Sequence, residues 1–415
     1  MGARLMLLAA CGMASIATAI LATACYMAPG EGHDLKYEAL ALPAIAPALG
    51  PDFMRGVDIS MARAIEEAGG VFRDEYGSRG DIIAILKAHG VNWIRLRIWH
   101  NPTDPAVDKS PGLNNYARTL AMAKRAKAAG LKFLLDFHYS DTWADPGKQT
   151  KPAAWSNLAY ADLKAALYAY TKQIVSDLAA AGAAPDMVQL GNEIPGGILW
   201  DDGKDETKLG ELLSEGSRAV REAAPSARIM LHVDRGGVDF TWFFDRYAAH
   251  GETAATRAAV DFDVIGLSWY PYFDSHKNLS NLKTRIAALK TRYGKDVVVA
   301  ETAYGWGLGY SDYTDNQFWT TQENHAAAQL DAVSDDGVLF AQREDGTRYV
   351  PASIANQALV TRAIMRAVKE SGGTGLFYWA GDWISAPGID STWENQALFD
   401  LEGTALPSMA VFGLE

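Results

Sequence analysis

The feature that most constrains the fold is a regular alternation of short apolar runs with longer runs at helical spacing. Eight apolar runs have the length and composition of buried strands: 53–58, 92–99, 132–139, 186–193, 228–234, 262–270, 296–302 and 375–381. The helical runs between them include Ile82–His89, Tyr116–Ala129, Leu163–Ala181, Leu209–Ala223, Leu279–Arg292 and Ile354–Glu370. This order predicts an α/β protein with a single (β/α)8 TIM barrel. A doubly wound open sheet is the alternative, and it would leave the last strand at an edge.

The connections between these elements are unequal in length. Long segments follow four of the predicted strands, at 99–113, 139–159, 194–207 and 303–352, whereas several helix-to-strand returns take only a few residues. In a TIM barrel the active site lies at the C-terminal ends of the strands and in the loops that follow them. We therefore expect the functional residues at that rim.

Two of the predicted strands run directly into a glutamate, Glu193 and Glu301. A carboxyl group is rare at the end of an apolar strand unless something there requires it. Paired carboxyl groups at one rim suit glycoside cleavage, in which a retaining enzyme uses one as nucleophile and the other as acid and then base. The alternative is that each glutamate caps the following helix or pairs with an arginine. Asn192, beside Glu193, could bind the 2-hydroxyl group of a sugar.

Other polar and aromatic residues are predicted at the same rim. Arg95 alternates with apolar residues, so a barrel interior must supply acidic partners for it, either a catalytic carboxylate or other core acids. The stretch containing His138, Asp141 and Trp143 suits hydroxyl recognition and sugar stacking. No metal-ligand spacing recurs around it, which argues against zinc. Tyr270 could orient the nucleophile or simply close the barrel top.

The first 25 residues have the pattern of a signal peptide. Arg4 precedes an uncharged apolar run that ends in small residues before Cys25. Ala22-Thr23-Ala24-Cys25 also resembles the bacterial lipoprotein signal, which would anchor the protein through a lipid on Cys25; an uncleaved membrane anchor is the alternative. Residues 26–51 are rich in Ala, Pro and Gly and are predicted as a linker before a domain at 52–415. We expect an extracytoplasmic protein: secreted, periplasmic or lipid-anchored at the bacterial surface.

Charge and cysteine content exclude other classes. The net charge is −12 and no basic cluster is visible, so we expect no nucleic-acid partner. Both cysteines, Cys11 and Cys25, lie in the signal segment, so the predicted domain contains no disulfide.

Several stretches resemble the endo-β-1,4-galactanases of glycoside hydrolase family 53, and the likeness spans residues 53–415. The stretches that carry it are Arg55–Ser60, Val91–Trp99, Asp136–Pro146, Gln189–Ile194, Ser268–Pro271 and Ser391–Asp400. The resemblance implies that Glu193 is the acid/base and Glu301 the nucleophile. It implies a galactan polysaccharide as substrate, namely the β-1,4-galactan side chains of pectin (type I arabinogalactan), with no required cofactor and a monomeric enzyme. Supporting and substrate-binding positions match Asp58, Arg95, His138, Asp141, Trp143, Asn192, Tyr270 and Trp379.

Two regions extend or limit this resemblance. After Trp379 the family usually continues Glu-Pro, whereas this chain has Ala380-Gly381-Asp382, which puts its remote sugar subsites in doubt. Bacterial relatives hold a structural calcium between the loops after the seventh and eighth strands. Oxygen ligands of that kind occur here at Asp312, Asp315 and Asn316, although a solvated polar loop would have the same composition.

Two other functions stay open at this point. The chain could be another endo-glycosidase of the same clan that acts on mannan or glucan. It could also be a non-catalytic surface lipoprotein that binds glycans, although the presence of both Glu193 and Glu301 argues against that interpretation.

Overall fold

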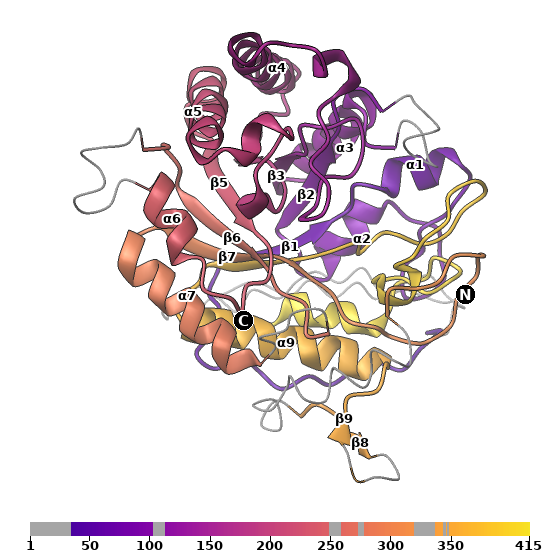
Figure 1. Cartoon of the computed structure of the whole chain (residues 1–415). Coiled ribbons are helices and arrows are strands. Elements are labelled where there is room, and N and C mark those ends of the chain that lie inside the picture. Colours follow the sequence, from indigo (N-terminus) through magenta and orange to yellow (C-terminus); the bar gives the residue numbers. More distant parts are fainter. Residues whose placement is uncertain are drawn as a thin grey trace, which may run out of the picture. The chain divides into compact units, whose positions relative to one another are not determined.

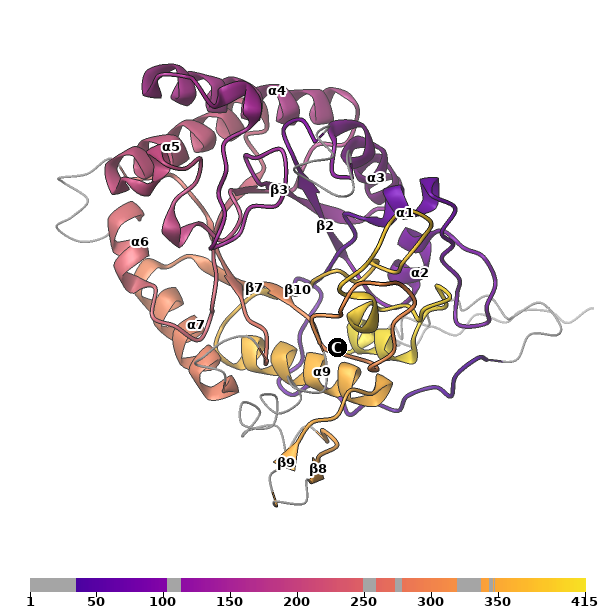
Figure 2. The same cartoon turned by 45° about the vertical axis from the view of Figure 1, so that its right-hand side comes forward.

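The computed structural model describes residues 35–102, 113–248, 259–272, 278–318, 337–342, 346 and 348–415. Eight parallel strands close into a barrel in the order β1-β10-β7-β6-β5-β4-β3-β2. Helices surround this barrel in Figure 1, and Figure 2 shows the strands enclosed by the helical ring. Because β1 pairs with β10, no strand of the barrel is left at an edge. The predicted TIM barrel is confirmed, and the open sheet is excluded.

All eight predicted strands are present, each within about two residues of the expected start. Their bounds are β1 Met54–Asp58, β2 Trp93–Ile98, β3 Lys132–Phe137, β4 Met187–Leu190, β5 Arg228–Val233, β6 Val264–Ser268, β7 Asp296–Thr302 and β10 Gly375–Tyr378. A separate two-stranded hairpin is formed by β8 Ala341–Gln342 and β9 Arg348–Tyr349.

The six predicted helices are also present, and the structure adds two short ones. The bounds are α1 Ala62–Glu67, α2 Ile82–Ala88, α3 Tyr116–Ala128, α4 Tyr160–Ala180, α5 Glu206–Ala223, α6 Thr241–Tyr247, α7 Leu279–Tyr293 and α9 Ile354–Glu370. Short 3-10 helices lie at Ala153–Trp155, Ile194–Gly196, Asp202–Lys204, Glu394–Gln396 and Pro407–Gly413. Several helices begin at a side chain that accepts backbone N–H bonds, such as Asp81 for α2 and Asp205 for α5. The short α1 has no side-chain cap, and α6 is capped by Asp239, which accepts the Thr241 N–H at 3.0 Å from a position before the N-cap Phe240.

Inside the barrel, the side chains form an apolar layer and a polar layer. The apolar layer contains Met54, Trp93, Leu134, Met187, Met230, Val264, Val298, Ala300 and Phe377. Further along the same strands, toward their C-terminal ends, the buried side chains are polar: Asp58, Arg95, Asp136, Gln189, His232 and Ser268. Since side chains two residues apart in a strand face the same side, both layers belong to one interior. The polar layer lies at the rim where the sequence predicted the active site.

The segment predicted as a linker needs a correction. Residues 35–51 belong to the same compact unit as the barrel. Ile45 and Leu49 are buried, and Arg362 of α9 donates hydrogen bonds to the carbonyl groups of Pro43 and Ala44. Residues 35–51 are therefore not a flexible linker despite their Ala- and Pro-rich composition, because apolar side chains of this segment are buried. The signal segment and residues 26–34 lie outside the described residues.

No helix among the described residues has the length and apolar character needed to cross a bilayer.

Candidate active site

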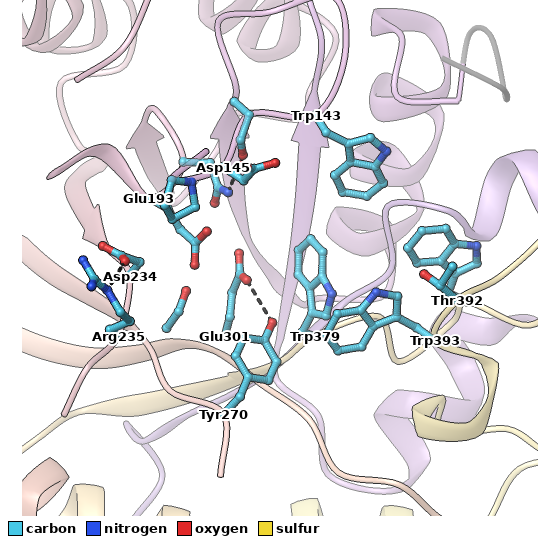
Figure 3. Close-up of a pocket in the computed structure, with 15 residues that line it drawn as sticks. Trp143, Asp145, Glu193, Asp234, Arg235, Tyr270, Glu301, Trp379, Thr392 and Trp393 are labelled. Carbon is cyan, nitrogen blue, oxygen red and sulfur yellow. Dashed lines mark hydrogen bonds and ion pairs between the residues drawn. The ribbon is translucent and has the colours of Figure 1, made fainter. Parts of the chain in front are cut away.

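A cleft of about 680 Å³ opens at the C-terminal rim of the barrel. Its lining includes Glu193, Glu301, Asn192 and Tyr270 together with four tryptophans, Trp143, Trp379, Trp383 and Trp393. Figure 3 shows the carboxyl groups of Glu193 and Glu301 facing one another in this cleft, with Trp379 and Trp393 to one side and Asp234 and Arg235 to the other. The two glutamates predicted from separate strands therefore meet in one site.

A bulge in β7 aims Glu301 into the cleft. Leu267 pairs with Val299, but the next residue, Ser268, pairs with Glu301, so Ala300 is an extra residue in the ladder. An extra residue changes which side of the strand faces inward. Ala300 still contributes to the apolar layer of the interior, and Glu301 follows it into the polar layer instead of pointing outward.

Glu301 is held by two partners. Arg95 Nη1 lies 2.8 Å from its Oε1, and Tyr270 donates its hydroxyl proton to Oε2 at 2.9 Å, as Figure 3 shows. The sequence analysis predicted this tyrosine contact. Burial raises the pKa of Glu301, while Arg95 and the Tyr270 hydrogen bond oppose that rise. Both partners stabilise the ionised carboxylate, which is the form that a nucleophile requires.

Glu193 has a different environment. It follows β4 with φ of 50°, in the left-handed region that non-glycine residues rarely adopt. Such strain persists where the surrounding structure fixes it, often at functional sites. Burial raises its pKa well above the usual value, and the nearby charge of Glu301 raises it further. Both effects favour the protonated form of Glu193, which is the form that a general acid requires.

Beneath the two glutamates, Arg95 is the centre of a buried network. Its guanidinium contacts Asp136 at 2.9 Å, Asp58 at 3.3 Å and the Asn192 amide oxygen at 3.0 Å. Burial opposes ionisation of Asp136, but the charge of Arg95 and the contact with His138 together outweigh it and lower the pKa of Asp136 to about 2. The acidic partners of Arg95 are therefore both core acids and Glu301, the predicted nucleophile. This network fixes the position of the Glu301 carboxyl group.

Asn192 lines the cleft and keeps one hydrogen free for a ligand. Its Oδ1 accepts from Arg95 Nη2 at 3.0 Å and from Gln189 Nε2 at 3.2 Å, and its Nδ2 donates to the Ala144 carbonyl at 2.9 Å. An amide nitrogen carries two hydrogens, and within the described residues only one of them is bonded, so this cleft residue retains a donor.

The tryptophans form an aromatic wall that is stiffened by Arg97. The rings of Trp143 and Trp383 stack with centroids 5.7 Å apart. The guanidinium of Arg97 lies 4.5 Å from the Trp143 ring and 4.4 Å from the Trp379 ring. The Trp143 and Trp379 rings meet edge to face with centroids 6.1 Å apart, and this one cation contacts both of them. Such a wall suits the apolar face of a sugar ring.

Four predicted substrate-binding residues do not line the cleft: Arg95, whose buried network is described above, and Asp58, His138 and Asp141. Asp58 is buried and binds Arg95 and Arg97. His138 accepts the Ala144 N–H at 3.0 Å through Nδ1, while its Nε2 lies 3.2 Å from Asp136. Asp141 accepts the backbone N–H groups of Asn101 and Ala153 and thereby ties two loops together. These side chains support the site from behind its surface.

Several site residues were missed by the sequence analysis. Asp145, Asp234, Arg235, Ser268 and Trp383 line the cleft, and His232 lies beneath it. A signal for His232 was present, because it is a polar residue near the end of an apolar strand, as Glu193 and Glu301 are. Asp234 and Arg235 follow that same strand. Asp382, where the chain departs from the family pattern, is buried and accepts the Met61 N–H at 2.9 Å, so it anchors the β1–α1 connection.

The residues predicted to bind calcium form a hydrogen-bonded junction. Asp312 accepts from the Ser385 hydroxyl at 2.5 Å, the Ser391 N–H at 2.6 Å and the Thr314 N–H at 2.7 Å. Asp315 is exposed, whereas the buried Asn316 Oδ1 has no hydrogen-bond partner within the described part of the chain. There, no group of three or more His, Cys, Asp or Glu is arranged to hold a metal ion. The carboxylate of Asp312 thus joins the loop after β7 to the loop after β10 by hydrogen bonds.

Comparisons with known proteins agree with this geometry. The family model "Glycosyl hydrolase family 53" matches residues 54–340 and 323–412. The "Endo-beta-1,4-galactanase" of Bacillus subtilis (strain 168) is 35% identical over 87% of this chain and 85% of its own length. The "Arabinogalactan endo-beta-1,4-galactanase" of Thermothelomyces thermophilus is 33% identical over 86% of this chain and 98% of its own.

Solved structures give the same result. The Ignisphaera aggregans GH53 catalytic domain superposes with a TM-score of 0.79 at 39% identity, covering 90% of this chain and 99% of that one. A fungal β-1,4-galactanase superposes with a TM-score of 0.69 at 31% identity, covering 86% and 98%. The chain therefore belongs to glycosyl hydrolase family 53 and is a glycoside hydrolase, whose cleft contains a pair of opposed carboxyl groups.

Proposed function

We propose that the protein is a retaining endo-β-1,4-galactanase that hydrolyses the β-1,4-galactan side chains of pectin. The observation that carries the proposal is the unequal pair of carboxyl groups in the cleft. Arg95 and Tyr270 favour the ionised form of Glu301, while burial and the charge of Glu301 favour the protonated form of Glu193. The named relatives, several of which are galactanases, support galactan as the substrate.

The reaction takes place in two displacements. In the first, Glu301 attacks the anomeric carbon and forms a glycosyl ester, while Glu193 gives its proton to the departing glycosidic oxygen. In the second, Glu193, now a carboxylate, removes a proton from water, which attacks the same carbon and releases Glu301. The anomeric configuration is inverted twice and is therefore retained.

The surrounding residues orient the sugar. The free Nδ2 hydrogen of Asn192 is placed to bind the 2-hydroxyl group, a contact that strengthens in the transition state. Trp379 offers a ring face to the sugar next to Glu301, and Trp143, Trp383 and Trp393 extend this aromatic surface along the cleft. Arg97 keeps the Trp143 and Trp379 rings in register.

The test uses both glutamates and two kinds of substrate. We expect Glu301→Ala to lose galactan hydrolysis by roughly four to six orders of magnitude while its thermal unfolding stays cooperative. Glu193→Ala should be slow on galactan but much less impaired in the glycosylation step on an aryl β-galactoside whose leaving group needs no protonation. Azide, which needs no general base, should restore its turnover. Equal losses on both substrates would contradict the acid/base role of Glu193.

A substrate panel tests the polysaccharide. The expected result is release of short β-1,4-galacto-oligosaccharides from potato-type galactan, with the β-anomer formed first, and far slower attack on mannan and glucan. Preferential cleavage of mannan or glucan would replace the proposed substrate by another from the same clan. Binding without any cleavage would replace the enzyme by a glycan-binding protein.

We further propose that the protein acts outside the cytoplasm as a monomer. The support is the signal-peptide pattern of residues 1–25 and the lipoprotein-like Ala22-Thr23-Ala24-Cys25. Fractionation of wild type and Cys25→Ala tests the anchor. A lipid on Cys25 predicts that wild type lies in the membrane fraction and the variant in the soluble fraction, whereas equal fractionation would favour plain secretion. Light scattering of the purified domain tests the monomer.

Calcium at Asp312, Asp315 and Asn316 stays a prediction. A bound ion would tie the loop after β7 to the loop after β10, which Asp312 already joins through Ser385 and Ser391. Calorimetric titration of the EDTA-treated protein with calcium, and melting with and without it, would decide.

A further inference from the structure

The strongest feature that the proposed reaction leaves unused is a buried imidazole beneath the acid/base. His232 of β5 is fully buried, and burial lowers its pKa well below the usual value, so the ring is neutral. Its two nitrogens reach two different groups that hold Glu193. A neutral imidazole donates at one nitrogen and accepts at the other.

Nδ1 is the accepting nitrogen. The backbone N–H of Glu193, which can only donate, points at Nδ1 from 3.4 Å. Gln189 Nε2, also a donor, lies 3.1 Å away. The Asn192 Oδ1 atom is 3.0 Å from Nδ1 and accepts from Arg95 Nη2 at 3.0 Å. Because the backbone N–H of Glu193 can only donate, it makes Nδ1 the acceptor and places the ring proton on Nε2.

Nε2 therefore donates to Ser268. The distance from Nε2 to Ser268 Oγ is 2.9 Å. Since the serine oxygen accepts this bond, its own proton is directed elsewhere. Ser268 and Glu193 line the same cleft, and the Ser268 hydroxyl group lowers the pKa of the Glu193 carboxyl group, as a hydrogen-bond donor does. His232 thus reaches Glu193 twice, through its main chain and through its side chain.

We propose that His232 and Ser268 are positioning residues that clamp Glu193 at both ends and supply the hydrogen bond that stabilises its carboxylate after it has given up its proton. This inference rests on the proposed role of Glu193 as acid and base. The backbone end of the clamp also explains how Glu193 keeps its left-handed conformation with φ of 50°. The side-chain end serves the second half-reaction, in which Glu193 must act as a base.

Other charged groups around Glu193 act in the opposite direction. Glu301 of β7, Asp234 after β5 and Asp145 after β3 all raise the pKa of Glu193, whereas the Ser268 hydrogen bond lowers it. The ring of His232 faces Arg95, which lowers its pKa, and Asp136, which raises it. Because the ring stays neutral, the clamp adds no charge of its own. It donates one directed hydrogen bond to a carboxylate that three acids otherwise destabilise.

The test separates the two ends of the clamp with paired variants. Ser268→Ala removes the bond to the carboxyl group and leaves the backbone bond intact, and Ser268→Thr is its control because it keeps a hydroxyl group. His232→Asn places an amide oxygen near the position of Nδ1 but is too short to reach Ser268. His232→Gln places an amide N–H near the position of Nε2.

The expected result for Ser268→Ala is a slower second step. Deglycosylation of the galactosyl enzyme, measured with an aryl β-galactoside, should fall about tenfold at neutral pH, because a pKa raised by about one unit leaves a smaller fraction of Glu193 as the carboxylate that acts as base. A product burst should then appear, and azide should restore turnover, since azide needs no base. The alkaline limb of kcat/KM should move up by roughly one pH unit, because the carboxylate has lost a stabilising donor. Ser268→Thr and His232→Gln should stay close to wild type, and His232→Asn should behave like Ser268→Ala.

The outcomes distinguish this inference from the function on which it rests. If Glu193→Ala shows azide rescue but Ser268→Ala and His232→Asn keep the wild-type burst and pH profile, the clamp is refuted and the catalytic assignment stands. If Ser268→Ala loses rate equally in both steps without an azide effect, the serine has only a structural role and the clamp is also refuted. If Glu193→Ala itself shows no azide rescue, the proposed function fails first.

Discussion

The apolar and polar layers of the barrel interior are formed by the same strands but have different roles. On β5, Met230 belongs to the apolar layer and His232, two residues later, to the polar layer. On β2, Trp93 and Arg95 show the same change. Both layers are buried, so burial alone does not explain the difference. The apolar layer gains stability by leaving water, whereas each polar side chain must recover its lost hydration from a partner.

The polar layer recovers hydration through mutual contacts rather than through solvent. Arg95 alone contacts Asp58, Asp136, Asn192 and Glu301. Buried ion pairs of this kind are poor sources of stability, because desolvation offsets most of their attraction. Their benefit here is geometric, since the network holds Glu301 and Asn192 at fixed positions in the cleft. The comparison indicates that the apolar layer stabilises the fold, whereas the polar layer positions the active site. Four variants can test that division.

The largest effect is expected from Arg95→Met. Removing this cation leaves Asp58, Asp136 and Glu301 buried around an uncharged side chain, which should cost about 3–5 kcal/mol of unfolding free energy. Activity on galactan should fall at least about 10³-fold, because the nucleophile loses the partner that keeps it ionised and placed. Urea unfolding and initial rates measure the two effects. A stable variant with nearly normal rates would show that the layers do not differ in function.

Met230→Ala provides the opposite case. The methionine is fully buried in the apolar layer, so its truncation should cost about 2–5 kcal/mol of stability. At a temperature where the variant is folded, kcat and KM on galactan should match those of wild type. A large loss of kcat in a folded Met230→Ala variant would mean that the apolar layer also sets the geometry of the cleft.

The sequence predicted the two layers unequally well. Strand positions, the closed barrel and the glutamates at two strand ends followed from periodicity and from the cost of a carboxyl group beside apolar residues. The sequence also predicted that Arg95 has acidic partners in the barrel interior, although it did not identify which acids. The polar layer also gives a local signal of a different type, since Arg95 and His232 break otherwise apolar strands. The sequence analysis interpreted Arg95 as a site residue on this ground but did not interpret His232.

What the sequence could not supply depends on contacts between distant segments. The bulge that turns Glu301 inward is visible only in the pairing of β6 with β7. The packing of residues 35–51 depends on α9, more than 300 positions later in the chain. Likewise, Asp141 looked like a sugar ligand because it follows His138, yet its carboxylate accepts bonds from two loop backbones. Composition cannot distinguish a side chain that faces substrate from one that faces its own chain.

A smaller effect is expected from Arg97→Lys. This variant tests whether Arg97 acts through its positive charge or through the packing of its planar group against the tryptophans. Lysine keeps the positive charge near Asp58 but cannot lie flat against Trp143 and Trp379. We expect kcat/KM on galactan to fall about tenfold, mainly through KM, with little change in the pH profile. Tryptophan fluorescence would report the loosened rings. A shift of the pH profile without a change in KM would instead assign Arg97 an electrostatic role like that of Arg95.

The smallest effect is expected from Asp234→Asn, and its sign is the informative part. Glu193 must be protonated to act as the acid, so kcat/KM falls as pH rises through its pKa. The charge of Asp234 helps to raise that pKa, after burial and Glu301. Replacing the aspartate should lower the pKa and move the alkaline limb toward lower pH by roughly half a unit. Arg235, which now pairs with Asp234 at 2.5 Å, would act in the same direction once its partner is neutral.

The matched control is Asp162→Asn, which removes the same charge from an exposed position in the first turn of α4. Its pH profile of kcat/KM should coincide with that of wild type. Because Asp234→Asn and Ser268→Ala move the alkaline limb in opposite directions, the two variants together determine whether one group, Glu193, controls it. If both moved it the same way, a group other than Glu193 would have to set the limb, and the division between a stabilising layer and a catalytic layer would need a different acid at its centre.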